Sequence, residues 1–377
     1  MSGNARTVRT LLPMAYDGLG PSATCVNLVS AMHGDDLRCF VHVDRNRAPI
    51  TAVPYAPAVP SWLSFLPYPY IQGLASRRTE HRYLRLAREG EVAYLWPAVS
   101  VETHRKVHER GIPIVLEGIN TRMRAARAVL DEAYESIGAA PAHDITDQRI
   151  EEEEEKLSLA SLFFAPSPGV EEALSDSPLH PSKIVSSSYG TSITQFAPAH
   201  TRRPNARCKV LFVGSVCVRK GVHHLLDAWE QADLDAELIL AGGVEDAIAN
   251  RCARQLARAD VRVCGHVTDV RALYQEADVF VLPSLEEGDP LVTYEAAAAG
   301  LPIIASPMGA TRMGHAEQCV RLVAPGDVDD LAEAMHELVS NPDVRSEWAD
   351  RAVRAIGSYS WEAVGRARAE ALVARLG

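Results

Sequence analysis

The sequence lacks three features that would assign it to a specialised class of protein. Its seven cysteines show no paired spacing, so neither a disulfide framework nor a zinc site is predicted and reduced thiols are expected. No run approaches the roughly eighteen apolar residues of a transmembrane helix, and residues 1–18 hold too short an apolar stretch for a signal peptide. A net charge of −11 argues against nucleic acid as the main partner. We therefore expect a cytoplasmic globular protein.

What the sequence does contain suffices for two domains. It has 377 residues, of which 47% are hydrophobic and 23% charged, an ordinary balance for a globular protein of this length. Residues 199–207 (AHTRRPNAR) are polar and contain a proline, which is typical of a linker. We therefore predict a first domain over residues 1–200 and a second domain that begins at residue 201.

The chain opens with a predicted strand over residues 7–14, a glycine turn and a helix over residues 23–32. This order indicates a Rossmann-like unit. The turn holds Asp17, Gly18 and Gly20. Glycine lets backbone approach a ligand closely, and a helix N-terminus points N–H donors at it. A tight turn without a ligand fits the local sequence equally well.

The most informative stretch spans residues 279–305 (VFVLPSLEEGDPLVTYEAAAAGLPIIA). It predicts a buried strand over 279–282, a loop, a helix over 290–299 that starts on a proline, and a second strand. Glu287 then lies in the loop and Glu295 lies in the helix. The helix N-terminus between them should present free amides, which bind anions or sugar oxygens. These amides belong to Gly288, Asp289, Leu291 and Val292.

Two carboxylates beside such a donor cluster could each hold a pair of vicinal hydroxyls, because an ionised carboxylate has two acceptor oxygens. A nucleotide sugar carries two such diols, one on the ribose and one on the transferred sugar. The competing interpretation is a surface loop before a core helix, in which the acids are incidental.

Glu287-x7-Glu295, with its flanking strand and the following AAAAGLPIIAS, resembles the E-x7-E motif of retaining GT-B glycosyltransferases of family 4, the group 1 glycosyl transferases. The resemblance implies an α/β GT-B fold, in which two Rossmann-like doubly wound parallel-sheet domains face a cleft. The second domain would cover residues 201–357, and a last helix over 358–377 would cross back to the first domain.

The resemblance also implies an activity. A family member transfers a sugar from a nucleoside diphosphate sugar to an acceptor hydroxyl with retention of anomeric configuration. The loop carboxylate Glu287 would face the donor sugar, and Glu295 would face the ribose. No cofactor and no metal ion are expected, because protein cations and helix ends stabilise the departing diphosphate.

Further donor-side residues follow from the same resemblance. Residues 214–221 (GSVCVRKG) resemble the family's G-x5-KG loop, so Lys220 would grip the diphosphate. Ser215 stands where many members have an arginine, and Arg219 is the nearest substitute. Val267 would lie beside the nucleobase through its backbone, and Arg312 is a second candidate for phosphate contact. Two solvated basic residues before a helix are the alternative for residues 219 and 220.

On the acceptor or sugar side, the resemblance singles out Asp17, Glu117 and Asn120, while Gly18 and Gly20 would lie near the donor phosphates. Many family members have a histidine where this chain has Glu117. That carboxylate could bond a sugar hydroxyl or an acceptor amino group, or it could cap the next helix. These possibilities stay open at this point.

A proline-rich and aromatic stretch over residues 48–75 predicts a long insertion loop. A helical stretch over 76–90 follows it and carries several arginines. They could form the mouth of the acceptor site, a patch for anionic or lipid surfaces, or an ordinary solvated face. These residues are Arg77, Arg78, Arg82, Arg85 and Arg88.

Two other classes remain open on the sequence alone. A nucleotide-sugar 2-epimerase of GT-B fold would bind the same donor, and a non-catalytic sugar-nucleotide-binding partner protein would explain the missing histidine and arginine. The expected ligands are a nucleotide sugar and a small-molecule, glycan or lipid-linked acceptor, with peripheral membrane contact as one option. The sequence does not determine the donor sugar, the base, the acceptor, the linkage or the oligomeric state.

Overall fold

The computed structural model describes residues 5–48, 50–59, 67–198 and 207–376. The predicted linker therefore lies outside the described residues except for its last position, and so does part of the predicted insertion loop.

The first half of the chain builds a seven-stranded sheet with the order β3-β2-β1-β4-β5-β6-β7, in which every neighbouring pair is parallel. Strands β4, β5 and β6 are short, almost wholly apolar runs, as expected where helices cover both faces. The strands are β1 (Arg6–Tyr16), β2 (Leu37–Asn46), β3 (Tyr55–Pro57), β4 (Val92–Leu95), β5 (Ile114–Glu117), β6 (Leu162–Ala165) and β7 (Ile184–Ser186).

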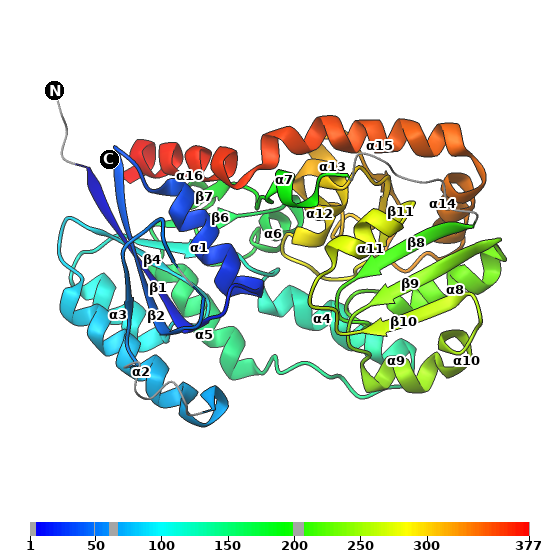
Figure 1. The fold of residues 1–377 in the computed structure, drawn as a ribbon. Helices are drawn as coiled ribbons and strands as arrows, with labels where there is room; N and C mark the ends of the chain where they lie inside the picture. Colours follow the sequence, from blue (N-terminus) through cyan, green and yellow to red (C-terminus); the bar gives the residue numbers. More distant parts are fainter. Residues whose placement is uncertain (1–4, 49, 60–66, 199–206, 377) are drawn as a thin grey trace.

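Helices connect these strands and cover the sheet, on the left of Figure 1. They are α1 (Gly20–Met32), α2 (Tyr68–Leu86), α3 (Val101–Glu109), α4 (Met123–Ser136), α5 (Asp147–Leu159), α6 (Pro168–Ala173) and α7 (Ile193–Phe196).

A second parallel sheet of six strands has the order β10-β9-β8-β11-β12-β13. Its first strand lies in the middle of the order, so the chain winds outward in both directions from a switch point between β8 and β11. The strands are β8 (Cys208–Val213), β9 (Ala236–Ala241), β10 (Val261–Gly265), β11 (Val279–Leu282), β12 (Ile303–Ala305) and β13 (Arg321–Leu322).

The last helix of the chain leaves the second unit and returns to the first. Figure 1 shows α15 running along the top of the molecule and α16 returning over the first sheet, where it packs on α1. The helices are α8 (Val222–Ala232), α9 (Asp246–Arg251), α10 (Ala253–Leu256), α11 (Arg271–Glu276), α12 (Leu291–Ala298), α13 (Thr311–Glu317), α14 (Val328–Ser340), α15 (Pro342–Ile356) and α16 (Trp361–Leu376).

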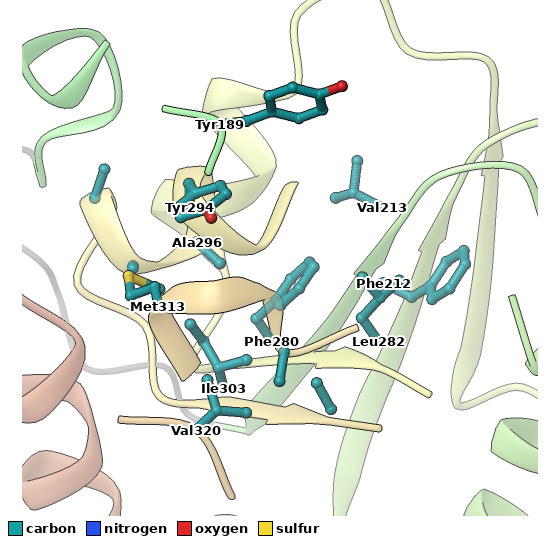
Figure 2. Packing of buried hydrophobic residues seen from close by; sticks show 14 of the residues in the cluster. Tyr189, Phe212, Val213, Phe280, Leu282, Tyr294, Ala296, Ile303, Met313 and Val320 are labelled. Carbon is teal, nitrogen blue, oxygen red and sulfur yellow. The ribbon is translucent and has the colours of Figure 1, made fainter. Parts of the chain in front are cut away.

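The core of the second unit lies on its sheet, as Figure 2 shows. Phe212 on β8 and Phe280 on β11 are fully buried, and Ile303 on β12 packs in the same cluster. Met313 of α13 fills the adjoining space. Because these side chains leave water almost completely, each contributes about 1.5–3 kcal/mol of transfer free energy. The loops that follow the strands are thus fixed to a rigid base.

These two parallel sheets agree with the two Rossmann-like domains that the resemblance implied. Three local predictions need correction. Residues 48–75 are not one loop, because they contain β3 and the first turns of α2. Helix α1 begins at Gly20 rather than at residue 23, with proline in its first turn. Pro290 caps α12 instead of occupying its first turn.

The reason for the first error is visible at the start of α2. Proline is tolerated in a first helical turn, where the missing N–H has no partner in any case. The helix is then held onto β2 by side chains, because Ser76 and Thr79 both donate to the buried Asp44 at 2.7 Å and 2.5 Å. Tyr68 donates to the same carboxylate at 2.7 Å. Tertiary contacts therefore outweighed the turn signals of the local sequence.

All seven cysteines are free thiols. None of the helices within the described ranges is both long and apolar enough to cross a membrane.

Candidate active site

The candidate site lies where loops at the carboxyl ends of both sheets meet, the position at which open α/β sheets bind ligands. Loop 283–290 follows β11, loop 214–221 follows β8, and loop 118–122 follows β5. The first and last of these touch directly at Gly288, where an added Cβ would lie only 1.8 Å from the carbonyl oxygen of Ile119. Glycine at this position lets the two domains close on each other.

Glu287 is the centre of the site. Lys220 Nζ donates to Glu287 Oε1, and Arg219 Nη1 lies 3.2 Å from Glu287 Oε2. The Ser284 hydroxyl adds a hydrogen bond of 3.3 Å. The glutamate and the lysine are both nearly buried, with 8% and 10% of their side chains exposed. Burial alone would raise the pKa of Glu287, but Lys220 and Arg219 outweigh it and hold that pKa below its usual value.

The loop after β8 places Lys220 by a close backbone approach. Gly214 has a φ of +138°, and an added Cβ would lie 2.9 Å from Lys220 Cε. A side chain at this position would therefore be strained and would collide with the lysine. Arg219, the next cation, keeps a third of its side chain exposed and has a raised pKa, because Glu287 and Glu286 together overcome its burial.

Glu286 is a functional candidate that the sequence interpretation missed. Its Oε1 accepts from the backbone N–H and the hydroxyl of Thr121 at 3.0 Å and 2.8 Å. Its Oε2 lies 3.4 Å from Arg219. The residue thus joins the first domain to the cation pair. The E-x7-E spacing selects its neighbour Glu287, and no sequence pattern connects Glu286 with Thr121, which lies 165 positions away.

Glu295 lies on α12 in a different environment. The Tyr274 hydroxyl, 2.9 Å from Glu295 Oε2, is its one recorded side-chain partner among the described residues. Burial raises the pKa of Glu295 to about 6. The first amides of α12, on Leu291 and Val292, have no carbonyl four residues earlier inside the helix and are available to a ligand.

One cavity is lined by residues of α12 and another by Arg219 and Glu286. The α1 cavity, of about 330 Å³, lies between the domains and is lined by Gly18, Gly20, Thr268, Leu291 and Glu295 among others. The β5 cavity, of about 280 Å³, lies mainly in the first domain and has a largely apolar lining. It is bordered by Trp96, Asn120, Met123, Arg219 and Glu286 among others. Of the predicted charged residues, Glu295 lines the α1 cavity, whereas Arg219 and Glu117 line the β5 cavity.

Other predicted residues lie near the site without facing either cavity. Ser215 is exposed in the loop after β8, and Val267 packs against the core while the neighbouring Thr268 lines the α1 cavity. Asp17 stabilises its own turn, since it accepts from Leu19 N at 3.1 Å and from the Ser22 hydroxyl at 3.0 Å.

Arg312 lies at the contact between the two domains, and its assignment to a phosphate stays a prediction. The Arg312 side chain crosses to the first domain, where it donates to the carbonyl of Ser187, to the carbonyl of Ala165 at 3.1 Å and to Glu171. The Nε and Nη2 donors of Arg312 thus help to hold the two domains together.

The contacts of Glu117 match none of the roles that the sequence analysis considered for it. Both of its oxygens bind Arg368 of α16, at 2.7 Å and 3.1 Å, and the Tyr94 hydroxyl donates to it as well. The two charged side chains are 0% and 1% exposed. Although Glu117 borders the β5 cavity, its acceptor capacity is used by the returning helix. It neither caps a helix nor stands free for a sugar.

Asp289 forms a further bond between the domains. Its carboxylate accepts from the backbone N–H of Tyr189 at 2.7 Å and from the Tyr294 hydroxyl at 2.9 Å. Both tyrosines are labelled in Figure 2. Burial raises the pKa of Asp289 to about 7. The loop 285–289 is thus fastened to the first domain at Glu286 and at Asp289, on both sides of Glu287.

Within the described residues, no group of three or more His, Cys, Asp or Glu side chains is arranged to hold a metal ion.

Known structures share this architecture over the whole chain. Sucrose-phosphate synthase from Thermosynechococcus elongatus superimposes with a TM-score of 0.73 at 18% identity, covering 98% of this chain and 99% of that one. Anabaena Alr3699/HepE, in complex with UDP-glucose, gives a TM-score of 0.68 at 16% identity over 98% and 99% of the two chains. The fold is GT-B.

A family model matches the second domain. Residues 207–341 match the model of the glycosyl transferases group 1 family.

Among curated relatives, MMP alpha-(1->4)-mannosyltransferase of Mycolicibacterium hassiacum is 31% identical over 216 residues, covering 55% of this chain and 52% of the relative. D-inositol 3-phosphate glycosyltransferase of Corynebacterium urealyticum is 30% identical over 209 residues, covering 48% and 49%. The chain spans about half the length of the curated relatives it matches.

Proposed function

We propose that the protein is a retaining glycosyltransferase that moves a sugar from a nucleoside diphosphate sugar to an acceptor hydroxyl, without a metal ion. The observation that carries the proposal is the convergence of Lys220 and Arg219 on the buried Glu287. Arg219 of this centre lines the β5 cavity, and Leu291 and Glu295 of the following helix line the α1 cavity. The names of the relatives and the family of the second domain support it.

In this proposal the nucleotide occupies the α1 cavity. Glu295, in its ionised form, accepts the two ribose hydroxyls, and the free amides of Leu291 and Val292 bind the diphosphate. Lys220 and Arg219 stabilise the charge that grows on the leaving diphosphate. Fixed cations in a site that excludes water act more strongly than in solution, which is the role a metal ion has in other transferases.

The acceptor approaches from the β5 cavity, whose mouth carries Arg219 and Glu286. Glu287 then faces the transferred sugar, and its negative charge favours the positive character that develops at the anomeric carbon. The diphosphate leaves and the acceptor enters from the same face of the sugar, which gives retention.

A two-stage experiment tests the proposal. A thermal-shift panel of UDP, GDP, ADP and dTDP identifies the base, because a ligand at a hundred times its Kd stabilises the folded state by about 2.7 kcal/mol. The matching nucleotide sugars are then followed for slow hydrolysis and transfer in the presence of EDTA, and NMR assigns the anomeric configuration of the product.

The expected result is one stabilising nucleotide, metal-independent cleavage of its sugar and an anomer like that of the donor. Lack of stabilisation by every nucleotide would contradict the proposal. Conversion of the donor to its 2-epimer without an acceptor would instead identify an epimerase, and inversion would contradict retention alone.

A further inference from the structure

Helix α2 exposes an apolar end to solvent. Tyr70 is 86% exposed and Leu74 is 73% exposed, which makes them the two most exposed large apolar side chains among the described residues. They lie four positions apart and therefore on one face of the helix. Single exposed apolar residues are ordinary, but two neighbours at this level of exposure on one helix face form a continuous apolar patch.

The same face continues as a row of basic side chains. Arg77, His81 and Arg85 follow Tyr70 at seven, eleven and fifteen positions, and Arg78 lies beside them. All four are exposed. The three arginines make no hydrogen bond or ion pair with any residue that the structure describes. Arg122 of the same domain, by contrast, pairs with two carboxylates.

The opposite face of α2 fixes this orientation. Thr79 and Ser76 bind Asp44, and Tyr83 is fully buried with its hydroxyl 3.1 Å from the carbonyl of Arg9. The single acidic residue of the helix, Glu80, turns toward α3, where it accepts from the hydroxyl and backbone of Ser100. The exposed face therefore carries apolar and basic groups without an acid, on a protein with a net charge of −11.

We propose that this face, defined by Tyr70, Leu74, Arg77, Arg78 and Arg85, docks on the surface of an anionic lipid bilayer. Anionic headgroups attract unpaired arginines, and an aromatic and an aliphatic side chain insert at the boundary between headgroups and acyl chains. A nucleic acid would satisfy the arginines but would leave Leu74 in water. The charge complementarity is local, because the rest of the molecule repels such a surface.

The position of α2 gives the contact a consequence. Its first residue, Tyr68, binds Asp44 near the end of β2, so the apolar end of α2 lies at the carboxyl edge of the first sheet. That edge also bears the candidate active site. Docking through α2, at the lower left in Figure 1, would hold the cleft close to the lipid surface. The docking inference goes beyond the transferase proposal and does not depend on it.

Vesicle flotation of the full chain tests the inference. The probes are vesicles of phosphatidylcholine alone and of phosphatidylcholine with about one third phosphatidylglycerol. The wild type should float with the anionic vesicles only. Arg77→Gln with Arg85→Gln should weaken partitioning about thirty-fold, since each basic residue near such a surface contributes roughly a factor of five. Tyr70→Ser with Leu74→Ser should weaken it about ten-fold or more.

The matched control is Arg354→Gln with Arg366→Gln, which removes two exposed arginines from α15 and α16 and changes the net charge equally. It should float like the wild type, and all variants should melt like the wild type because none of these side chains is buried. The inference fails if the wild type does not float, if the control loses as much as the α2 pair, or if duplex DNA binds as tightly through the same arginines. Nucleotide binding without vesicles reports on the transferase proposal separately.

Discussion

Two glutamates of the same loop and helix, Glu287 and Glu295, are held in opposite ways. Glu287 faces Lys220 and Arg219, so its charge is compensated inside the protein and its pKa is lowered. Glu295 has a tyrosine hydroxyl as its side-chain partner, and burial raises its pKa to about 6. The first carboxylate is therefore held in position without a ligand, whereas the second has acceptor capacity left for the hydroxyl groups of a ligand.

The two environments suit the two glutamates to different roles in the proposed reaction. A carboxylate whose position is set by two cations is suited to act on the transition state, where geometry must not change during the reaction. A carboxylate with spare acceptor capacity is suited to binding. Variants at these positions should therefore separate stability, turnover and affinity from one another.

The largest effect is expected for Glu287→Gln. The change leaves Lys220 buried beside a neutral amide, and the loss of one partner of a buried ion pair typically costs 3–5 kcal/mol. Because the amide oxygen still accepts a hydrogen bond, we expect about 3 kcal/mol in the free energy of unfolding at neutral pH. Turnover should fall while affinity for the free nucleoside diphosphate changes little. Urea unfolding, a transfer assay and calorimetry measure the three quantities, and equal loss of all three would make Glu287 a structural residue only.

A smaller effect on stability but a clear effect on rate is expected for Lys220→Ala. Glu287 keeps Arg219 as a partner, so the fold should survive. Loss of one electrostatic contact to a leaving group typically lowers kcat by about 10²–10³. Lys209→Ala, which removes a paired lysine on β8 remote from the site loops, is the matched control. Near-normal turnover of a folded Lys220→Ala protein would return this lysine to a structural role.

The parts of this comparison that follow from sequence are those with local causes. Proline, glycine and apolar runs within 27 consecutive residues encode the strand, loop and helix around Glu287 and Glu295. The positions of these elements could therefore be predicted from the sequence. The glycine loop that carries Lys220 could also be predicted, because its signal lies within a few consecutive residues. Contacts between segments that lie far apart in the sequence could not be predicted.

Arg312 and Glu117 illustrate the contacts that could not be predicted from the sequence. A loop arginine near a predicted anion site favours a phosphate contact, yet Arg312 binds carbonyls more than a hundred positions away. The partner of Glu117 is Arg368, 251 positions away on a helix whose return over the first sheet decides the contact. Buried ion pairs of this kind depend on where the chain closes in space, and no periodicity in the sequence encodes that.

A third variant, Glu295→Gln, tests the binding half of the comparison. A neutral amide is a weaker acceptor for the ribose diol than a carboxylate, so affinity for the free nucleoside diphosphate should fall by about 1–3 kcal/mol. Calorimetry at pH 8, where Glu295 is ionised, should show the full effect. The wild type should itself lose affinity as the pH falls below about 6, and the variant should not. Identical nucleotide affinities of variant and wild type would remove Glu295 from the ribose.

The same substitution should stabilise the protein without ligand, and the effect should depend on pH. Since the folded-state pKa of Glu295, about 6, lies above its ordinary value of 4.5, the folded state holds this proton more tightly than the unfolded state. Stability from this group is therefore fully present below pH 4.5 and is lost as the pH rises through 6. A shift of this size corresponds to about 2 kcal/mol, which Glu295→Gln should recover at pH 7.5 and not at pH 4.5.

Glu287→Gln should show the opposite trend, because the lowered pKa of Glu287 gives stability that is lost on acidification. Urea unfolding of both variants at the two pH values decides the matter, and a Glu295→Gln protein that is less stable than wild type at pH 7.5 would mean that this carboxylate is already satisfied within the fold.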